Sequence, residues 1–167
     1  MRSIHDNLQA VKDRIARASA AAGREPGSVT LLAVSKTHPA PLVEQAVAAG
    51  QRALGENYVQ EAVEKMDILQ GLDIEWHLIG PLQSNKTRIV AGRFDWVHTV
   101  ESEKIARRLS GQRSGNLPPL NVLIQVNVSG EATKSGVLPG DVFPLAEATR
   151  KLPRLKLRGL MAIPEPG

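Results

Sequence analysis

Short apolar runs alternate with segments of helical periodicity along the whole chain, and this alternation most constrains the fold. The run VTLLAV at residues 29–34 is almost wholly apolar, which is typical of a strand buried on both faces. Six strands are predicted, at residues 29–34, 53–54, 74–79, 96–100, 120–128 and 155–163. The helices predicted between them cover residues 42–49, 58–69, 85–91, 103–109 and 141–151. Such alternation favours a parallel sheet with right-handed crossovers.

A further helix is predicted ahead of the first strand. Apolar residues recur at helical spacing from Ile4 to Ala18, and Gly23 and Pro26 end the pattern. We therefore expect residues 1–25 to form an N-terminal helix that packs on the main domain.

A parallel sheet of this kind forms either an open doubly wound sheet or a closed (β/α)₈ (TIM) barrel. No Gly-x-Gly-x-x-Gly turn follows the first strand, which argues against a dinucleotide-binding Rossmann domain. A barrel of usual length would need two further βα units, or roughly 60–80 more residues. We therefore expect residues 1–167 to be one α/β domain, a TIM barrel truncated after about six βα units and incomplete at its C-terminus.

Composition excludes several classes of protein. No apolar run approaches the roughly 18 residues of a membrane span, and the N-terminus lacks the apolar centre of a signal peptide. Cysteine is absent, which fits a reducing cytoplasm, and a cytoplasmic location is predicted. The net charge of +4 comes from scattered basic residues with few aromatics, so no nucleic-acid partner is expected.

Functional residues of βα-barrels lie where strands end and loops begin. The uncommon chemistry of this chain gathers at those positions, namely residues 35–38, 55–58, 77–86, 98–99, 127–136 and 161–162. They include His38, His77 and His98, which are all the histidines outside the N-terminal helix. The pattern predicts one site at one rim of the sheet.

Lys36 is the first candidate for that site. Strand alternation places Val34 and Lys36 on one face of the first strand. A lysine that ends an apolar strand is expected to lose water around its ammonium group, which favours the neutral, nucleophilic amine. The alternative is a strand-end lysine whose charged head reaches solvent, and spacing alone favours it.

The other rim residues have structural alternatives as well. Asn57 could contact a ligand or cap the following helix, and His77 could be catalytic or a hydrogen-bonded core residue without an obvious carboxylate partner. The loop with Gln83, Asn85 and Lys86 suits an anion, or a simple helix cap. Lys134 lies in a glycine-containing loop and is either a surface lysine or a ligand contact. The histidine spacing predicts no metal site.

Several motifs occur together in the order of one family. They are LLAVSKT around Lys36, GENYVQE, EWHLIGPLQSNK, LNVLIQVNVS, KSG and LRGLMAIP. In these motifs the chain closely resembles the pyridoxal phosphate homeostasis proteins, relatives of the barrel domain of alanine racemase. The resemblance covers essentially the whole chain.

The resemblance implies a TIM barrel of the alanine racemase type that holds pyridoxal 5′-phosphate (PLP) as a Schiff base on Lys36. The family's pocket positions fall on Val34, Asn57, His77 and Met161, with Gln83, Asn85, Lys86 and Lys134 as weaker contacts. It further implies a protein of vitamin B6 homeostasis without robust catalysis, which buffers or carries PLP. PLP-dependent apo-enzymes that receive the cofactor are among the partners it suggests.

Two further expectations follow from the resemblance. The alternative function is a PLP-dependent racemase-like enzyme, but such catalysis needs a second acid/base, and Tyr58 is the only tyrosine. The family continues past the sixth strand into the segment that holds the cofactor phosphate. A chain without that segment is therefore expected to bind PLP weakly and to associate through open sheet edges, whereas the full-length form is expected to be monomeric.

Overall fold

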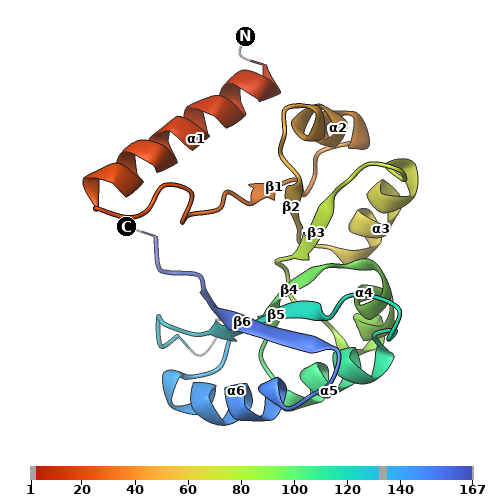
Figure 1. The fold of residues 1–167 in the computed structure, drawn as a ribbon. Coiled ribbons are helices and arrows are strands. Elements are labelled where there is room, and N and C mark those ends of the chain that lie inside the picture. The colour runs from red at the N-terminus through yellow and green to blue at the C-terminus, as the bar shows by residue number, and fades with distance from the viewer. Residues whose placement is uncertain (1–2, 132–134, 167) are drawn as a thin grey trace.

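The computed structural model describes residues 3–131 and 135–166. Its strands form one sheet in which every neighbouring pair is parallel and consecutive in the chain (Figure 1). The strands are β1 (Ala33–Val34), β2 (Ala53–Glu56), β3 (Glu75–Leu78), β4 (Trp96–Val100), β5 (Leu120–Val126) and β6 (Leu155–Ala162). This order confirms the predicted α/β class with alternating strands and helices.

Helices cover one side of the curved sheet and leave its other side open (Figure 1). Those between the strands are α2 (Ala40–Ala48), α3 (Val59–Ile68), α4 (Thr87–Arg93), α5 (Glu103–Gln112) and α6 (Val142–Arg150), with short 3-10 turns η1 (Ser84–Lys86) and η2 (Pro139–Asp141). The N-terminal helix α1 (Ile4–Ala21) packs against α2. Within the described part of the chain, no helix is long and apolar enough to cross a membrane.

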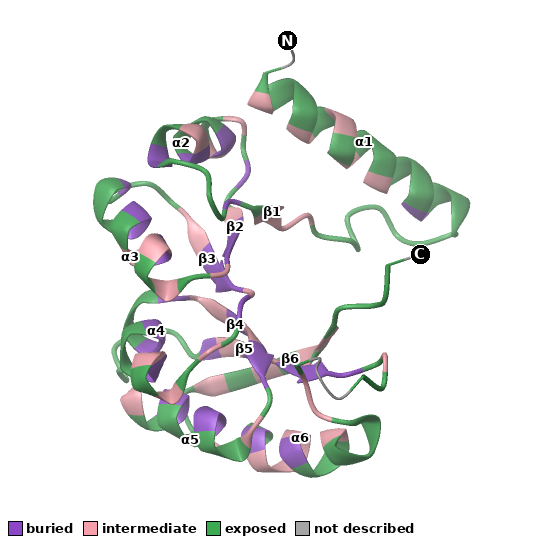
Figure 2. Ribbon diagram, turned by 180° about the vertical axis from the view of Figure 1, so that it is seen from behind, coloured by how far each residue is buried: buried purple, intermediate pink, exposed green. Residues whose placement is uncertain are grey.

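The hydrophobic core lies between the sheet and its helices (Figure 2). Leu54 pairs in register with Trp76, and Val97 with Val122, and all four side chains are buried in this core. Each fully buried apolar side chain of this size stabilises the fold by roughly 1.5–3 kcal/mol. Because strand residues alternate, the residues between these core positions face the opposite, inner side of the sheet.

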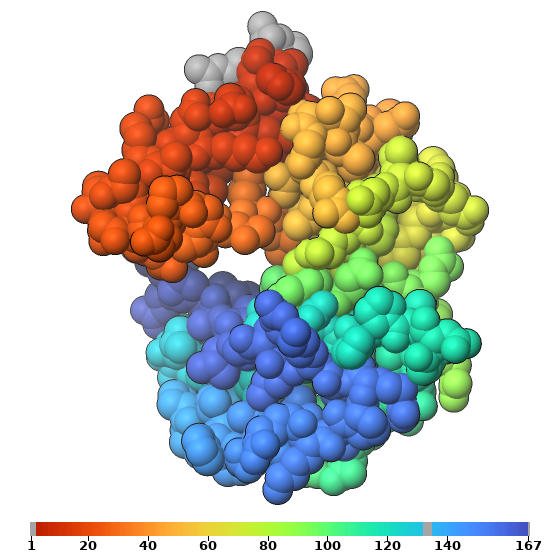
Figure 3. Space-filling model, viewed as in Figure 1, coloured from red at the N-terminus to blue at the C-terminus, as the bar shows by residue number. Residues whose placement is uncertain are grey.

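The first strand is shorter and more exposed than predicted. Strand pairing covers only Ala33 and Val34, and Val34 is 50% exposed. The reason is position: β1 lies at the edge of the sheet, where β2 is its single neighbour and pairs with only two of its residues. The space-filling view shows that this side of the molecule is indented between the N-terminal segment and the final strand (Figure 3).

Candidate functional site

Strand register brings the predicted rim residues to one edge of the sheet. Val34 pairs with Gly55 and Gly55 with His77, so these residues lie at one level across the sheet. Two residues further along each strand come Lys36, Asn57 and, on β4, His98. Lys36 and Asn57 therefore follow the carboxyl ends of their strands at one level, and His98 lies at the corresponding level within β4.

Lys36 lies in a turn directly after β1. Its neighbour Ser35 is buried, and the Ser35 hydroxyl donates a hydrogen bond to Glu56 Oε1 at 3.0 Å, on the helix-covered side of the sheet. Lys36 itself is exposed and makes no hydrogen bond or ion pair with any described residue. The expectation that its ammonium loses water is therefore wrong here, because an edge strand leaves the turn open to solvent.

Asn57 follows β2 at the same level. Its side-chain Oδ1 is buried and has no hydrogen-bond partner among the described residues. Gly80 packs directly on the backbone of Asn57, since a Cβ at Gly80 would lie 2.1 Å from the Asn57 carbonyl oxygen. Asn57 does not cap α3 with its side chain, because Tyr58 stands at the N-cap position.

A cavity of about 300 Å³ opens beside Asn57 at this rim. It is lined by Asn57, Ile79, Pro81, Thr99, Gln125, Val126, Asn127, Ser129, Ser135 and Ile163. Thr99 at its wall donates a hydrogen bond from Oγ1 to the Gly80 carbonyl at 2.8 Å. A larger cavity of about 710 Å³ lies between α1 and the segment ahead of β2, at the opposite end of the strands.

His77 is the centre of a polar chain on the inner face of the sheet. Its Nε2 lies 2.6 Å from Glu75 Oε1, and its Nδ1 lies 2.8 Å from His98 Nε2. If the His77 Nε2–H donates to the carboxylate, Nδ1 accepts from the His98 Nε2–H, and His98 Nδ1 remains an acceptor. The chain can therefore hold or pass a proton between Glu75 and the rim.

Both imidazoles favour their neutral forms. Burial lowers the pKa of His77, against the opposing effect of the Glu75 carboxylate, and burial together with the neighbouring His77 lowers the pKa of His98 to about 4. The sequence did not suggest a carboxylate partner for His77. The two-residue spacing of Glu75 and His77 could have indicated this partner, because it puts both side chains on one face of the strand.

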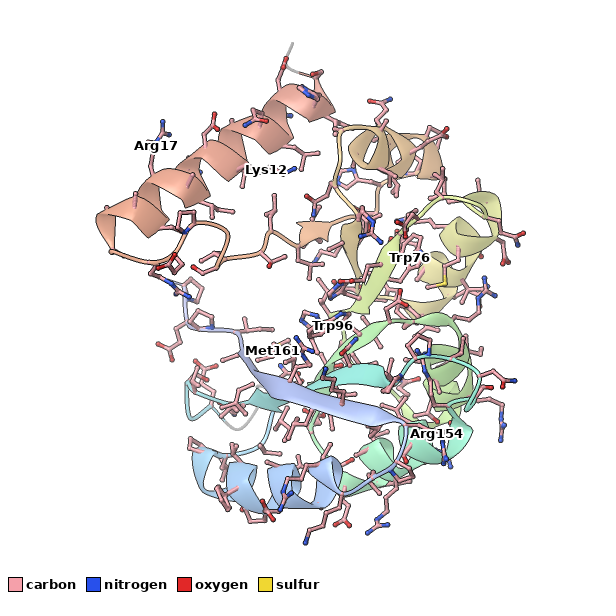
Figure 4. All side chains as sticks on the ribbon, in the orientation of Figure 1. Lys12, Arg17, Trp76, Trp96, Arg154 and Met161 are labelled. Carbon is pink, nitrogen blue, oxygen red and sulfur yellow. The ribbon has the colours of Figure 1, made fainter. Side chains whose placement is uncertain are left out.

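Aromatic and cationic groups extend this inner layer toward β6. Trp96 stacks on His77, with ring centroids 5.2 Å apart, and the Arg158 guanidinium lies 5.4 Å from the Trp96 ring centroid. Met161 is half-buried on β6, where it pairs in register with Gln125. Figure 4 labels Trp96 and Met161 on their strands β4 and β6.

The remaining predicted residues are less closely associated with Lys36. Gln83 and Asn85 are exposed and Lys86 is half-buried, around the turn η1, and the described contacts do not join them to Lys36 or His77. Lys134 lies outside the described residues. No group of residues that could hold a metal ion is found within residues 3–131 and 135–166.

Comparison with known proteins identifies the family. Residues 7–165 match the family model "Alanine racemase, N-terminal domain". Over 99% of its length the chain is 60% identical to the pyridoxal phosphate homeostasis protein of Pseudomonas aeruginosa and covers 72% of that relative. The chain belongs to the pyridoxal phosphate homeostasis protein family.

Solved structures agree with this family. The chain matches PipY of Synechococcus elongatus, solved with PLP bound, with a TM-score of 0.75 and 39% identity over 90% of this chain and 70% of PipY. Alanine racemase of Bacillus anthracis, with bound L-Ala-P, matches with a TM-score of 0.63 at 17% identity, over 93% of this chain and 39% of the racemase. The second likeness shows a shared fold, which for this homeostasis-family chain is that of the alanine racemase barrel.

Proposed function

We propose that this protein binds PLP covalently through Lys36 and buffers or carries it inside the cell, without robust catalysis. The observation that carries the proposal is the position of Lys36, an exposed amine at the carboxyl rim of the sheet, level in strand register with Asn57 on the neighbouring strand. Membership of the homeostasis family and the PLP-bound relative PipY support it.

The residues at this rim suit such a ligand. PLP carries an aldehyde and several hydrogen-bonding groups, and a lysine amine that has given up its proton to solvent can attack the aldehyde carbon, with loss of water. Lys36 supplies that amine, and the buried Asn57 Oδ1 offers a hydrogen-bond acceptor with no protein partner among the described residues. Val34, His77 and Met161 are proposed as the pocket walls, with Gln83, Asn85, Lys86 and Lys134 as outer contacts.

A binding role is favoured over turnover by the chemistry near Lys36. Racemization needs a second acid/base opposite the lysine, and Tyr58, the chain's only tyrosine, is 61% exposed at the start of α3. Burial lowers the pKa of both His77 and His98 and favours their neutral forms. Transfer of PLP to apo-enzymes is part of this proposal, and the cytoplasmic location remains a prediction from the sequence.

Covalent trapping tests the proposal directly. The protein is mixed with PLP, reduced with borohydride and digested, and the modified lysine is identified by mass spectrometry. We expect the pyridoxyl group on Lys36, and we expect Lys36→Ala to lose the visible absorbance band of the bound cofactor. Lys104→Ala, which removes another exposed lysine on α5, is the matched control. Persistence of the band in Lys36→Ala would refute the assignment.

The racemase alternative has its own assay. The PLP-loaded protein is incubated with L-alanine, and D-alanine is measured by chiral chromatography. We expect no D-alanine above the level formed by free PLP, and protein-dependent formation of D-alanine would favour the enzyme.

A further inference from the structure

A buried ion pair lies beneath the turn that carries Lys36. Lys65 on α3 places its Nζ 2.6 Å from Glu56 Oε1 at the end of β2. The Glu56 side chain is fully buried and that of Lys65 is 6% exposed. Charged residues are almost never buried so deeply unless they are paired.

This pair reaches the backbone on both sides of Lys36. Lys65 Nζ donates a hydrogen bond to the Ser35 carbonyl at 2.6 Å. It also donates to Glu61 Oε1 at 3.0 Å, and the same Glu61 oxygen accepts the Thr37 N–H at 2.6 Å. Lys36 is therefore the residue between two backbone groups that are each held by a charged side chain, and hydrogen bonds to charged groups are the stronger kind.

The turn needs such support. Thr37 has a φ of 65°, in the left-handed region that a β-branched residue rarely adopts. Strained conformations of this kind persist only where the surrounding structure determines them strongly, and they gather at functional sites. Two hydrogen bonds hold this turn: the Thr37 N–H donates to Glu61 Oε1 at 2.6 Å, and the His38 N–H donates to the Ser35 carbonyl at 3.1 Å.

Stability alone does not explain the buried pair. Well-packed apolar residues often replace a buried ion pair with no loss of stability. Here Glu56 Oε2 is also buried without a hydrogen-bond partner among the described residues, which is unfavourable. We therefore interpret the Glu56–Lys65 pair as fixing the backbone geometry of the turn at residues 35–37.

We propose that Glu56, Glu61 and Lys65, which we call the turn clamp, are positioning residues that hold the Lys36 amine at the inner rim. Ser35 directs its hydroxyl to Glu56 on the helix-covered side, and Lys36, the next residue, is exposed at the start of the turn that the clamp holds. This inference rests on the proposed function, because it concerns how Lys36 is presented to PLP.

The clamp has a readout that does not involve PLP. Hydrogen exchange of the Thr37 amide is measured by NMR in the cofactor-free protein. Glu61→Ala leaves the Glu56–Lys65 pair intact and is expected to speed this exchange about tenfold or more, because a hydrogen bond to a charged group is lost. Glu103→Ala, which removes another i,i+4 ion pair on α5, is the matched control and should leave Thr37 unchanged.

The second readout is the rate at which PLP attaches to Lys36. A misplaced amine attacks more slowly, and displacement by about 1 Å can reduce a rate about a hundredfold. We expect Glu61→Ala to slow attachment about tenfold or more, and Glu61→Gln, which keeps an oxygen acceptor for Thr37, to lie closer to the unmodified protein. Attachment at the unmodified rate in Glu61→Ala would overturn the positioning role.

A double variant tests the Ser35 side without leaving a buried charge unpaired. Glu56→Gln with Lys65→Met removes both charges together, so folding should survive while the Ser35 carbonyl loses its cation. Slow attachment supports the clamp, and unmodified attachment in this folded variant contradicts it. If the unmodified protein fails to trap PLP on Lys36, the proposed function falls, and the Thr37 exchange still decides whether the clamp exists.

Discussion

At the scale of single residues, some residues of the site could be predicted from the sequence and others could not. Lys36, Asn57 and His77 follow or end strands, and the βα order was enough to place them at one edge. The burial of Lys65 could not be predicted, because a lysine four residues after a glutamate on a helix normally forms an exposed ion pair. Only the packing of α3 on the end of β2 buries it.

Substitution of Gly80 tests how closely this residue packs on the Asn57 backbone. We expect Gly80→Ala to lower the free energy of unfolding by about 1–3 kcal/mol, because the new methyl group would collide with the Asn57 backbone. Denaturant unfolding measures the change. Gly92→Ala, on α4 with open space around it, is the control and should leave stability equal or higher. Equal effects of the two substitutions would contradict the close approach.

The two inner histidines predict a pH dependence of stability. A histidine whose pKa is lowered by folding binds fewer protons in the folded than in the unfolded state, so stability falls as the pH drops below the unfolded value. For His98 the window runs from the ordinary histidine pKa of 6.5 down to the folded-state pKa of about 4. Allowing for solvent screening, the loss across it is about 1–2 kcal/mol.

His98→Asn should flatten this pH dependence, whereas His5→Asn on exposed α1 should not. Urea unfolding at a series of pH values between neutrality and pH 4 measures the difference. A His98→Asn profile parallel to that of the unmodified protein would argue against a neutral, buried His98.

At the scale of elements, the agreement with the sequence depends on whether a strand has neighbours on both sides. The predicted strand at residues 96–100 is β4 residue for residue, because β3, β5 and two helices bury its apolar positions. The predicted first strand at residues 29–34 shortened to two residues at the sheet edge. An apolar run indicates that a segment favours burial. Whether a neighbouring strand is present to pair with it depends on the whole sheet.

Arg113 joins several elements and should be sensitive to substitution. It is buried after α5 and donates hydrogen bonds to the carbonyls of Ala91, Phe94 and Pro118. We expect Arg113→Met to lower the free energy of unfolding by about 2–4 kcal/mol, because the buried carbonyls lose a charged donor. Thermal or denaturant unfolding measures it, with the exposed Arg107→Met as control. A loss no larger than that of the control would refute the role.

At the scale of the whole molecule, both edge strands present unpaired backbone groups. β1 and β6 each have one neighbour, and Leu160 on β6 is 59% exposed. A chain of residues 1–167 expressed alone is therefore expected to associate as its concentration rises, since open edges pair with other chains. Analytical ultracentrifugation measures this, and Leu160→Lys should reduce it. A monomer at all concentrations would contradict the expectation.

The strand order also has a consequence for how the protein is made. Every strand lies beside the strand that precedes it in the chain, so each new βα unit finds its docking partner already synthesised. Contacts that close over short sequence separations form early and need little loop-closure entropy. The sheet can therefore be assembled in the order in which the ribosome synthesises it, one βαβ unit at a time, with the hydrogen bonds of the Lys36 turn completed once α3 has been synthesised.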